Sequence, residues 1–174
     1  MSYRGTMPRP RAFDEETVVE SAARLFARRG FDAVSIDDLV GELGIHRHSL
    51  YRTFGSKRGL YLRALRAARG QLRHALSADD SLRTLCAAVA SEEIGALDLL
   101  LMAAIEQGSA DPEIAAEVRG AFAELDSCTA APGRDGTVPT ATLLGLRVRA
   151  RAGEAIADFA AETTGRTVAT TEGE

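Results

Sequence analysis

The segment from Ser35 to Lys57 limits what this chain can fold into more than any other stretch of the sequence. Ser35 is a preferred helix N-cap residue, and Asp38 stands three positions later, where its side chain can reach back to the cap. The apolar residues that follow have the spacing of one buried helix face: Ile36, Leu39, Val40 and Leu43. We therefore predict a helix that begins at Ile36.

Gly44 predicts a sharp turn after this helix, because glycine adopts a positive φ without steric cost. Ile45 follows as an apolar plug, and a second helix is predicted from about His46 to Thr53. Leu50 faces inward in that helix, and its outer face carries Arg47, His48, Ser49 and Arg52. Two short helices joined by a tight turn are typical of a helix-turn-helix, whose second helix enters the major groove of DNA.

The same segment resembles the DNA-binding end of the TetR/AcrR family of bacterial transcriptional regulators. The positions that match in order and spacing are Ser35, Leu43-Gly44-Ile45, Leu50-Tyr51, Phe54 and Ser56-Lys57. The resemblance runs from about Phe13 to about Leu65. It implies an all-α fold, in which an N-terminal three-helix helix-turn-helix domain joins a C-terminal helical domain for ligand binding and dimerisation.

Two positions depart from the family pattern. Gly41 replaces the small alanine usual in the second helix, which packing can tolerate. Gly59 stands where an acidic residue commonly completes the capping box of the fourth helix. Without that partner, and with glycine in the first turn, we expect the start of this helix to be weakened by about 0.5–1.5 kcal/mol.

Three parts of the chain follow from these patterns. Residues 1–12 are expected to be a flexible basic arm, residues 13–57 the DNA-binding domain with a linking helix over 57–75, and residues 76–174 the regulatory and dimerisation domain. The arm contains Arg4, Arg9 and Arg11. Such arginines can enter a minor groove, but a solvated tail is the favoured interpretation. Translation can start at Met1 or at Met7.

Helical signals also occur outside the central segment, and no strand pattern or repeat accompanies them. Asp14 and the Asp111-Pro112 pair are predicted helix starts. The helices expected outside the central segment span about 15–29, 57–75, 82–89, 96–105, 112–125, 140–152 and 154–163. The linking helix carries a stripe of arginines that can contact DNA, although a solvated face is the favoured interpretation: Arg66, Arg69 and Arg73.

Charge is divided unevenly along the chain. Residues 1–74 hold 14 basic and 8 acidic side chains, whereas residues 75–174 hold 7 and 17. A basic N-terminal part is the asymmetry expected when only that end meets nucleic acid. The apolar run 94–105 is interrupted by Asp98 and too short to span a membrane. Two distant cysteines give no disulfide framework, which favours a reducing cytoplasm.

The resemblance and the chemistry of the side chains nominate the DNA contacts. Tyr51 and Lys57 match positions where the family holds phosphates, and Arg47 and His48 lie where base edges are read. The complete set of candidates is Ser35, Arg47, His48, Ser49, Tyr51, Arg52, Thr53 and Lys57. A metal site at His46 and His48 is disfavoured, because residues two apart on a helix point to different sides.

Effector binding and dimerisation are implied by the resemblance. The expected pocket residues are Leu99, Met102, Glu106 and Phe122, with ordinary core as the alternative. The expected dimer contacts are Phe122, Leu125, Leu144 and Val148, with an intrachain core helix as the alternative. A redox switch through Cys86 or Cys128 is disfavoured, since nothing marks either thiol as accessible and polarised.

We therefore predict a homodimeric transcriptional repressor that leaves a pseudo-palindromic operator when it binds a small-molecule effector. The alternative is a constitutive DNA-organising protein of the same fold without a ligand switch. An enzyme is not expected, because the sequence offers no nucleophile with a base, no metal set and no phosphate loop. No cofactor and no membrane partner are expected.

Overall fold

The computed structural model describes residues 13–77, 81–91, 93, 95–130, 133 and 135–156. Within these ranges the chain is helical and contains no strand, which confirms the all-α prediction. The helices are α1 (Glu15–Arg29), α2 (Ile36–Leu43), α3 (Arg47–Phe54), α4 (Lys57–Ala75), α5 (Ser81–Ala90), α6 (Ala96–Glu106), α7 (Pro112–Thr129) and α8 (Thr137–Arg151). The expected arm over residues 1–12 lies outside the described residues.

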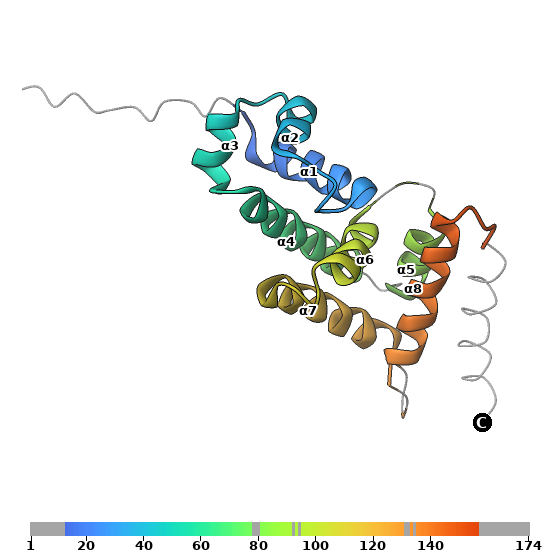
Figure 1. The fold of residues 1–174 in the computed structure, drawn as a ribbon. Helices are drawn as coiled ribbons and strands as arrows, with labels where there is room; N and C mark the ends of the chain where they lie inside the picture. Colours follow the sequence, from blue (N-terminus) through green and yellow to red (C-terminus); the bar gives the residue numbers. More distant parts are fainter. Residues whose placement is uncertain are drawn as a thin grey trace, which may run out of the picture.

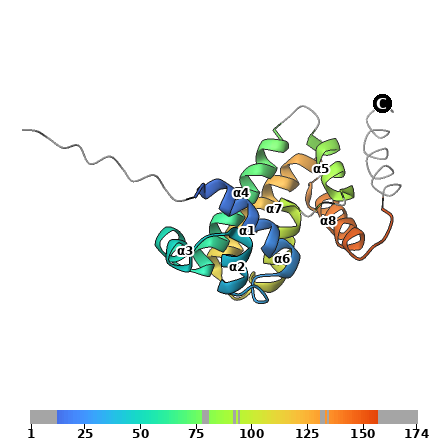
Figure 2. The ribbon, with the colours of Figure 1, turned by 90° about the horizontal axis from the view of Figure 1, so that it is seen from above.

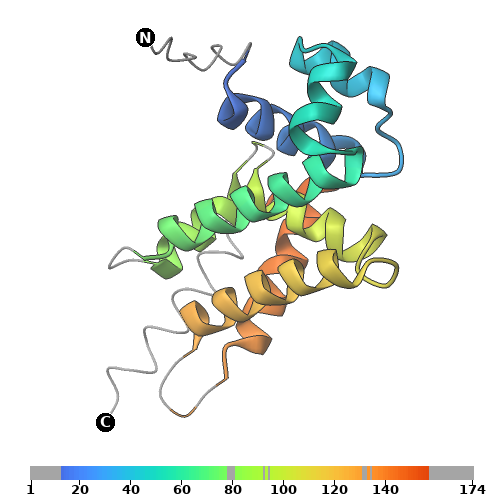
Figure 3. The same ribbon diagram turned by 90° about the vertical axis from the view of Figure 1, so that its left-hand side faces the viewer.

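The long helix α4 is the axis of the arrangement (Figure 1). It starts beside α3, passes along α1 and reaches the end of the molecule where α5 and α8 lie. Figure 3 shows α4 between α1 on one side and α7 on the other. Seen from above, α3 lies at one extremity and α5 and α8 at the opposite one (Figure 2). Helix α3, the second helix of the helix-turn-helix, is therefore presented at an end of the molecule.

Two apolar cores hold this arrangement together. The larger one runs from the helix-turn-helix through α4 into α6 and α7, and it includes Leu39, Leu50, Tyr61, Leu100 and Val118. The smaller one lies among α5, α6, α7 and α8, and it includes Leu85, Val89, Leu97, Leu125 and Leu143. Leu72 and Phe122 pack against both cores. These two side chains therefore connect the two cores.

The predicted helix starts are found where the capping chemistry placed them. The Asp14 carboxylate accepts from the backbone N–H groups of Glu16 and Thr17 at the start of α1. Asp111 accepts from Glu113 and Ile114 at the start of α7. Each cap satisfies N–H groups that have no partner inside the helix.

The start predicted for α8 was wrong by three residues. The helix begins at Thr137 and not at Thr140. The Asp135 carboxylate accepts from both the backbone N–H and the hydroxyl of Thr137, which starts the helix early. Pro139 is tolerated in the first turn, because N–H groups there need no intrahelical acceptor. Of the helix expected over 154–163, residues 154–156 are not helical and the remainder lies outside the described residues.

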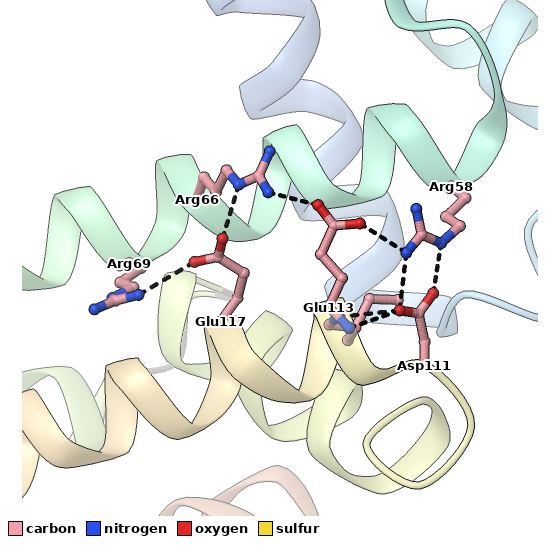
Figure 4. A network of polar contacts seen from close by, with 7 residues as sticks. Arg58, Arg66, Arg69, Asp111, Glu113 and Glu117 are labelled. Atoms are coloured by element: carbon pink, nitrogen blue, oxygen red, sulfur yellow. Dashed lines mark hydrogen bonds and ion pairs between the residues drawn. The ribbon is translucent and has the colours of Figure 1, made fainter.

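The arginine stripe of α4 is not a purely solvated face, which corrects the interpretation from sequence. Arg66 donates to Glu113 and Glu117 of α7, with N–O distances of 2.8 Å. Arg69 donates to Glu117 and Glu124. Arg58, in the first turn of α4, pairs with Asp111 and Glu113. Figure 4 shows these three arginines of α4 and the side chains of Asp111, Glu113 and Glu117 that they contact. We call this set of residues the α4–α7 ladder.

A buried ion pair that the sequence analysis missed fixes the other end of the molecule. The Asp98 carboxylate of α6 accepts from Nε and Nη2 of Arg147 in α8, at 2.9 and 2.6 Å. Only 2% of the Arg147 side chain and 4% of the Asp98 side chain are exposed. Arg147 also donates to the carbonyls of Val89, Ser91 and Glu93. All five of its N–H donors therefore have acceptors.

Within the described ranges, no helix combines the length and hydropathy needed to cross a bilayer. The same residues contain no group of three or more His, Cys, Asp or Glu side chains arranged to hold a metal ion.

Candidate nucleic-acid interface

The helix-turn-helix is built by the local signals of its sequence. The Ser35 hydroxyl accepts from the Asp38 N–H at 3.0 Å, and the Asp38 carboxylate accepts from the Ser35 N–H at 2.8 Å. Both halves of the predicted capping box are thus present. Gly44 takes a left-handed conformation, with φ 62° and ψ 25°, between the two helices. Leu39 and Leu50 are fully buried, which fixes the rotation of α2 and α3.

The outer face of α3 gathers the side chains nominated for DNA contact. Arg47, His48, Tyr51 and Arg52 are exposed on this face, and 42% of Tyr51 is accessible. Ser49 and Thr53 are half-buried at its margins. A phenol, an imidazole and two guanidinium groups can donate to phosphates and to base edges. The arrangement thus brings one aromatic and several cationic or polar groups to one end of the protein.

Arg47 already has an anionic partner. Its guanidinium forms an ion pair with Asp37 of α2, and both side chains are exposed. The hydrogen bond to Asp37 raises the pKa of Arg47 above its usual value. To reach a guanine, Arg47 has to leave this carboxylate. Ser35 is similarly engaged, since its hydroxyl serves as the cap of α2.

Lys57 lies closer to the protein than the sequence analysis expected. Its ammonium donates to the carbonyls of Phe31 and Val34, each at 2.9 Å. The same nitrogen is 4.2 Å from the centre of the Phe31 ring, in a cation–π contact. The amine therefore locks the connection between α1 and α2 to the first turn of α4. Its contact with phosphate stays a prediction.

Glu106, nominated for an effector pocket, is found at the same connection. Its carboxylate accepts from the Phe31 N–H at 2.6 Å, while the neighbouring Gln107 donates to Asp32. Gly30 has a φ of 81°, and a Cβ atom there would collide with the Glu106 carboxylate. Phe31 is thus held by α4 through its carbonyl and by α6 through its N–H. The last turn of α6 touches the DNA-binding end directly.

The other pocket candidates lie on α6 and α7. Leu99 is fully buried in the larger core, and Met102 and Phe122 are half-buried. A cavity of about 240 Å³ among α4, α5, α6 and α8 has a different lining, which includes Gln71, Leu72, Ala88, Leu97, Asp98 and Arg147. The effector residues nominated from sequence stay a prediction. The buried ion pair at this cavity was signalled only by an acidic residue inside an apolar run.

The expected dimer contacts divide into an inner and an outer set. Leu125 is buried inside the smaller core, and Phe122 is half-buried between the cores. Leu144 is half-buried on α8, and 49% of Val148 is exposed. The outward face of α8 carries an exposed stripe of small and apolar residues, which we call the α8 stripe: Val138, Ala141, Gly145 and Val148.

Gly59 has a physical reason to be glycine in this chain. Its N–H donates to the Ser56 hydroxyl at 2.9 Å, so half of a capping box remains. A Cβ atom at this position would collide with the carbonyl oxygen of Phe54 at the end of α3. The absence of a side chain therefore lets α3 approach the start of α4. The expected weakening of this helix start stays a prediction.

Comparison with known proteins gives matches to the same segment and to the whole fold. The family model described as "Bacterial regulatory proteins, tetR family" matches residues 18–64. Over 57 residues the chain is 49% identical to the HTH-type transcriptional repressor BdcR of Escherichia coli, a match that covers 33% of this chain and 29% of BdcR. Over 121 residues it is 32% identical to the uncharacterized HTH-type transcriptional regulator YezE of Bacillus subtilis, covering 63% of this chain and 62% of YezE. The chain thus spans less than two thirds of either relative.

Two solved structures share the overall arrangement. A putative TetR-family transcriptional regulator from Rhodococcus sp. superposes with a TM-score of 0.67 at 16% identity, covering 87% of this chain and 95% of that one. The regulator CifR, in a cysteine mutant complexed with a 26-base-pair operator duplex, gives a TM-score of 0.62 at 26% identity, covering 90% and 97%. The first likeness concerns the fold alone.

Proposed function

Since the chain belongs to the TetR family of bacterial regulatory proteins, we propose that it is a sequence-specific DNA-binding transcriptional regulator. The observation that carries this proposal is the exposed polar face of α3, held at one extremity by a capped and glycine-turned helix-turn-helix. The operator duplex in the CifR complex supports DNA as the partner. The family is one of regulators, so enzymatic turnover is not expected.

Recognition divides between positioning and reading. Tyr51 and Arg52, exposed in the second half of α3, are assigned to phosphate contacts that hold α3 in register. Arg47 and His48 lie in the first turn of the recognition helix, where side chains reach base edges. Arg47 exchanges Asp37 for the O6 and N7 atoms of a guanine. Its ion pair keeps the guanidinium oriented near the groove until a duplex arrives.

A second copy of the chain completes the proposal. The α8 stripe exposes Val138 (73% accessible) and Val148, and Gly145 between them allows close approach of a partner helix. A two-fold dimer through this face places two recognition helices on the half-sites of a pseudo-palindrome. The intrachain alternative is favoured less, because this face of α8 is open in the described residues.

We further propose that a small molecule releases the protein from its operator, which makes it a repressor. The relative BdcR, which is named as a repressor, supports this direction. The cavity beside Asp98 and Arg147 is the candidate site. A constitutive DNA-organising protein of the same fold is the alternative, and a compound that lowers operator affinity separates the two.

The central test is fluorescence anisotropy on the DNA upstream of the chain's own gene, with a scrambled duplex of equal length. We expect a preference for the upstream DNA, and Arg47→Ala should relax the base preference at one position per half-site by about 1–3 kcal/mol. Arg24→Ala is the matched control, because Arg24 is exposed on α1 and its guanidinium donates to Ser21. Equal affinity for both duplexes would favour the organising protein, and no affinity for either would refute DNA binding.

Lys57 allows a second test, because its two roles change different quantities. If its ammonium only locks the α1–α2 connection, Lys57→Met lowers the melting temperature and the affinity while the dependence of affinity on salt keeps its slope. If it neutralises a phosphate, the slope of log K against log salt falls by about 0.9. We expect the first result, measured by anisotropy over a salt series with thermal unfolding in parallel.

A further inference from the structure

A groove of about 830 Å³ lies between the first turns of α1 and the middle of α4, which run side by side (Figure 3). Its floor is apolar and consists of Phe13, Val19 and Ala67. Along its α1 wall stand four carboxylates: Asp14, Glu15, Glu16 and Glu20. We call this feature the α1–α4 groove. It is neither the recognition face nor the cavity assigned to an effector.

Two of these carboxylates form no ion pair with the residues that the structure describes. The two arginines of the groove are already paired, Arg63 with Glu15 and Arg66 with the α4–α7 ladder. Asp14 caps α1. Glu16 and Glu20 are exposed and form no ion pair within the described part of the chain. They lie one helical turn apart, so they repel each other and favour a cationic occupant.

The chain carries such an occupant directly beside the groove. Residues 1–12 contain Arg4, Arg9 and Arg11 and no acidic residue. The residue that follows them is Phe13, which belongs to the groove floor. Pro8 and Pro10 favour an extended backbone and bring apolar rings suited to the floor.

The spacing of the charges also agrees. Glu16 and Glu20 are separated by about 6 Å along the helix axis, given a rise of about 1.5 Å per residue. Arg9 and Arg11 are separated by about 6–7 Å in an extended chain. Folding back after Phe13 therefore brings Arg11 to Glu16 and Arg9 to Glu20. The short tether keeps the effective concentration of the arm high at this site.

We propose that the basic arm, residues 1–12, docks into the α1–α4 groove in the free protein and leaves it when DNA binds. Docking competes with DNA binding, because the carboxylates of Glu16 and Glu20 and the phosphates of DNA bind the same arginines of the arm. Exposed ion pairs are weak and screened by salt, so a duplex displaces the arm readily. The release step rests on the proposed function, whereas docking does not.

The test uses the full chain labelled with ¹⁵N and compares it with the double variant Glu16→Gln/Glu20→Gln. In the native chain we expect reduced mobility and shifted amide signals for Arg9 and Arg11. The double variant, or about 0.5 M salt, should return both signals to those of a solvated tail. Glu42→Gln is the matched control, since Glu42 is exposed on α2 and pairs with Arg28. Identical arm signals in the native chain and the double variant would overturn docking.

Release is measured on the same samples with a non-specific duplex. We expect the duplex to move the arm signals away from the docked position, and the double variant to bind this duplex about threefold more tightly at low salt. Arm signals that stay docked on a saturating duplex would overturn release. If the chain binds no duplex at all, the proposed function fails, while the comparison of signals without DNA still decides docking.

Discussion

Two of the places where arginine and carboxylate side chains join helices differ in their access to water. The α4–α7 ladder lies on the surface, where Arg58 and Arg66 are nearly half exposed. The pair of Asp98 with Arg147 is almost completely buried. Each exposed ladder contact contributes little to the free energy of unfolding, so the ladder stabilises the fold through the sum of its contacts. Burial of the Asp98–Arg147 pair costs desolvation free energy, and the complete hydrogen bonding of the guanidinium offsets this cost.

This difference shows which kind of contact fixes the relative positions of the helices. A ladder of flexible side chains tolerates small sliding of α7 along α4, because one carboxylate serves two arginines, as Glu113 and Glu117 do. The buried guanidinium allows only one arrangement of α6, α8 and the end of α5, because it binds the Val89 carbonyl of α5 and the Ser91 and Glu93 carbonyls that follow this helix. The first interface joins the DNA-binding end to α7, and the second one anchors α8 at the opposite end.

The largest effect is expected when the buried pair is broken. Asp98→Ala leaves the Arg147 charge buried without its carboxylate, and the free energy of unfolding should fall by about 3–5 kcal/mol. Urea denaturation followed by circular dichroism measures this loss. The double variant Asp98→Leu/Arg147→Met replaces both charges by apolar side chains and should recover most of the stability. A loss below about 1 kcal/mol in the single variant would place the pair in the same class as the ladder.

Acid should weaken the ladder as a whole before it disturbs the apolar cores. The hydrogen bond from Arg58 lowers the pKa of Asp111 to about 2, and Arg58 and Arg66 lower the pKa of Glu113. A carboxylate with a lowered pKa stabilises the fold above its unfolded pKa near 4, and that stability is lost as the pH falls toward 2. The melting temperature should therefore drop across this window.

The comparison with Arg58→Gln isolates the ladder from other carboxylates. Asp38 titrates in the same direction, because its pKa is lowered by hydrogen bonds from Ser35 and Arg29. Its contribution is common to both chains and cancels in the difference. Thermal unfolding between about pH 5 and pH 2 should show a smaller drop for the variant. Parallel curves would mean that Arg58 does not stabilise the carboxylates in solution.

The smallest effect is expected from a single ladder rung. Arg69→Ala removes contacts to Glu117 and Glu124 and should cost about 0.2–1 kcal/mol, less at high salt. Arg73→Ala is the control, because Arg73 is exposed on the same stripe and forms no ion pair within the described residues. Urea denaturation at low and high salt resolves the two variants. If Arg69→Ala lowered the free energy of unfolding as much as Asp98→Ala, exposed and buried ion pairs would not differ in this protein.

Much of the fold was predictable because its signals are local. The capping box of Ser35 and Asp38, the turn at Gly44 and the Asp111-Pro112 start all act within four residues. The exposure of the α3 side chains follows from the burial of Leu50 in the same helix. Short-range steric and hydrogen-bonding rules therefore suffice for the helix-turn-helix and for most helix boundaries.

The partners of the charged side chains were not predictable, because they lie far away in the chain. Arg147 is 49 positions from Asp98, and Glu106 is 75 positions from Phe31. Lys57 was assigned to phosphate from its place in the motif, although its acceptors lie 23 and 26 residues upstream. A signal did exist for the buried pair, since a charge in an apolar run needs a partner. Nothing in the sequence identified which partner it has.

The lock formed by Lys57 has a practical consequence, because Lys57 is the only lysine in the sequence. A reagent that acylates amines meets one side-chain target in this chain, and that target is half-buried and held by two carbonyls. Acylation at this position must wait until the connection between α1 and α2 opens. The rate of acylation at Lys57 would therefore report how often the connection between α1 and α2 opens. Binding of DNA or of an effector would change this rate.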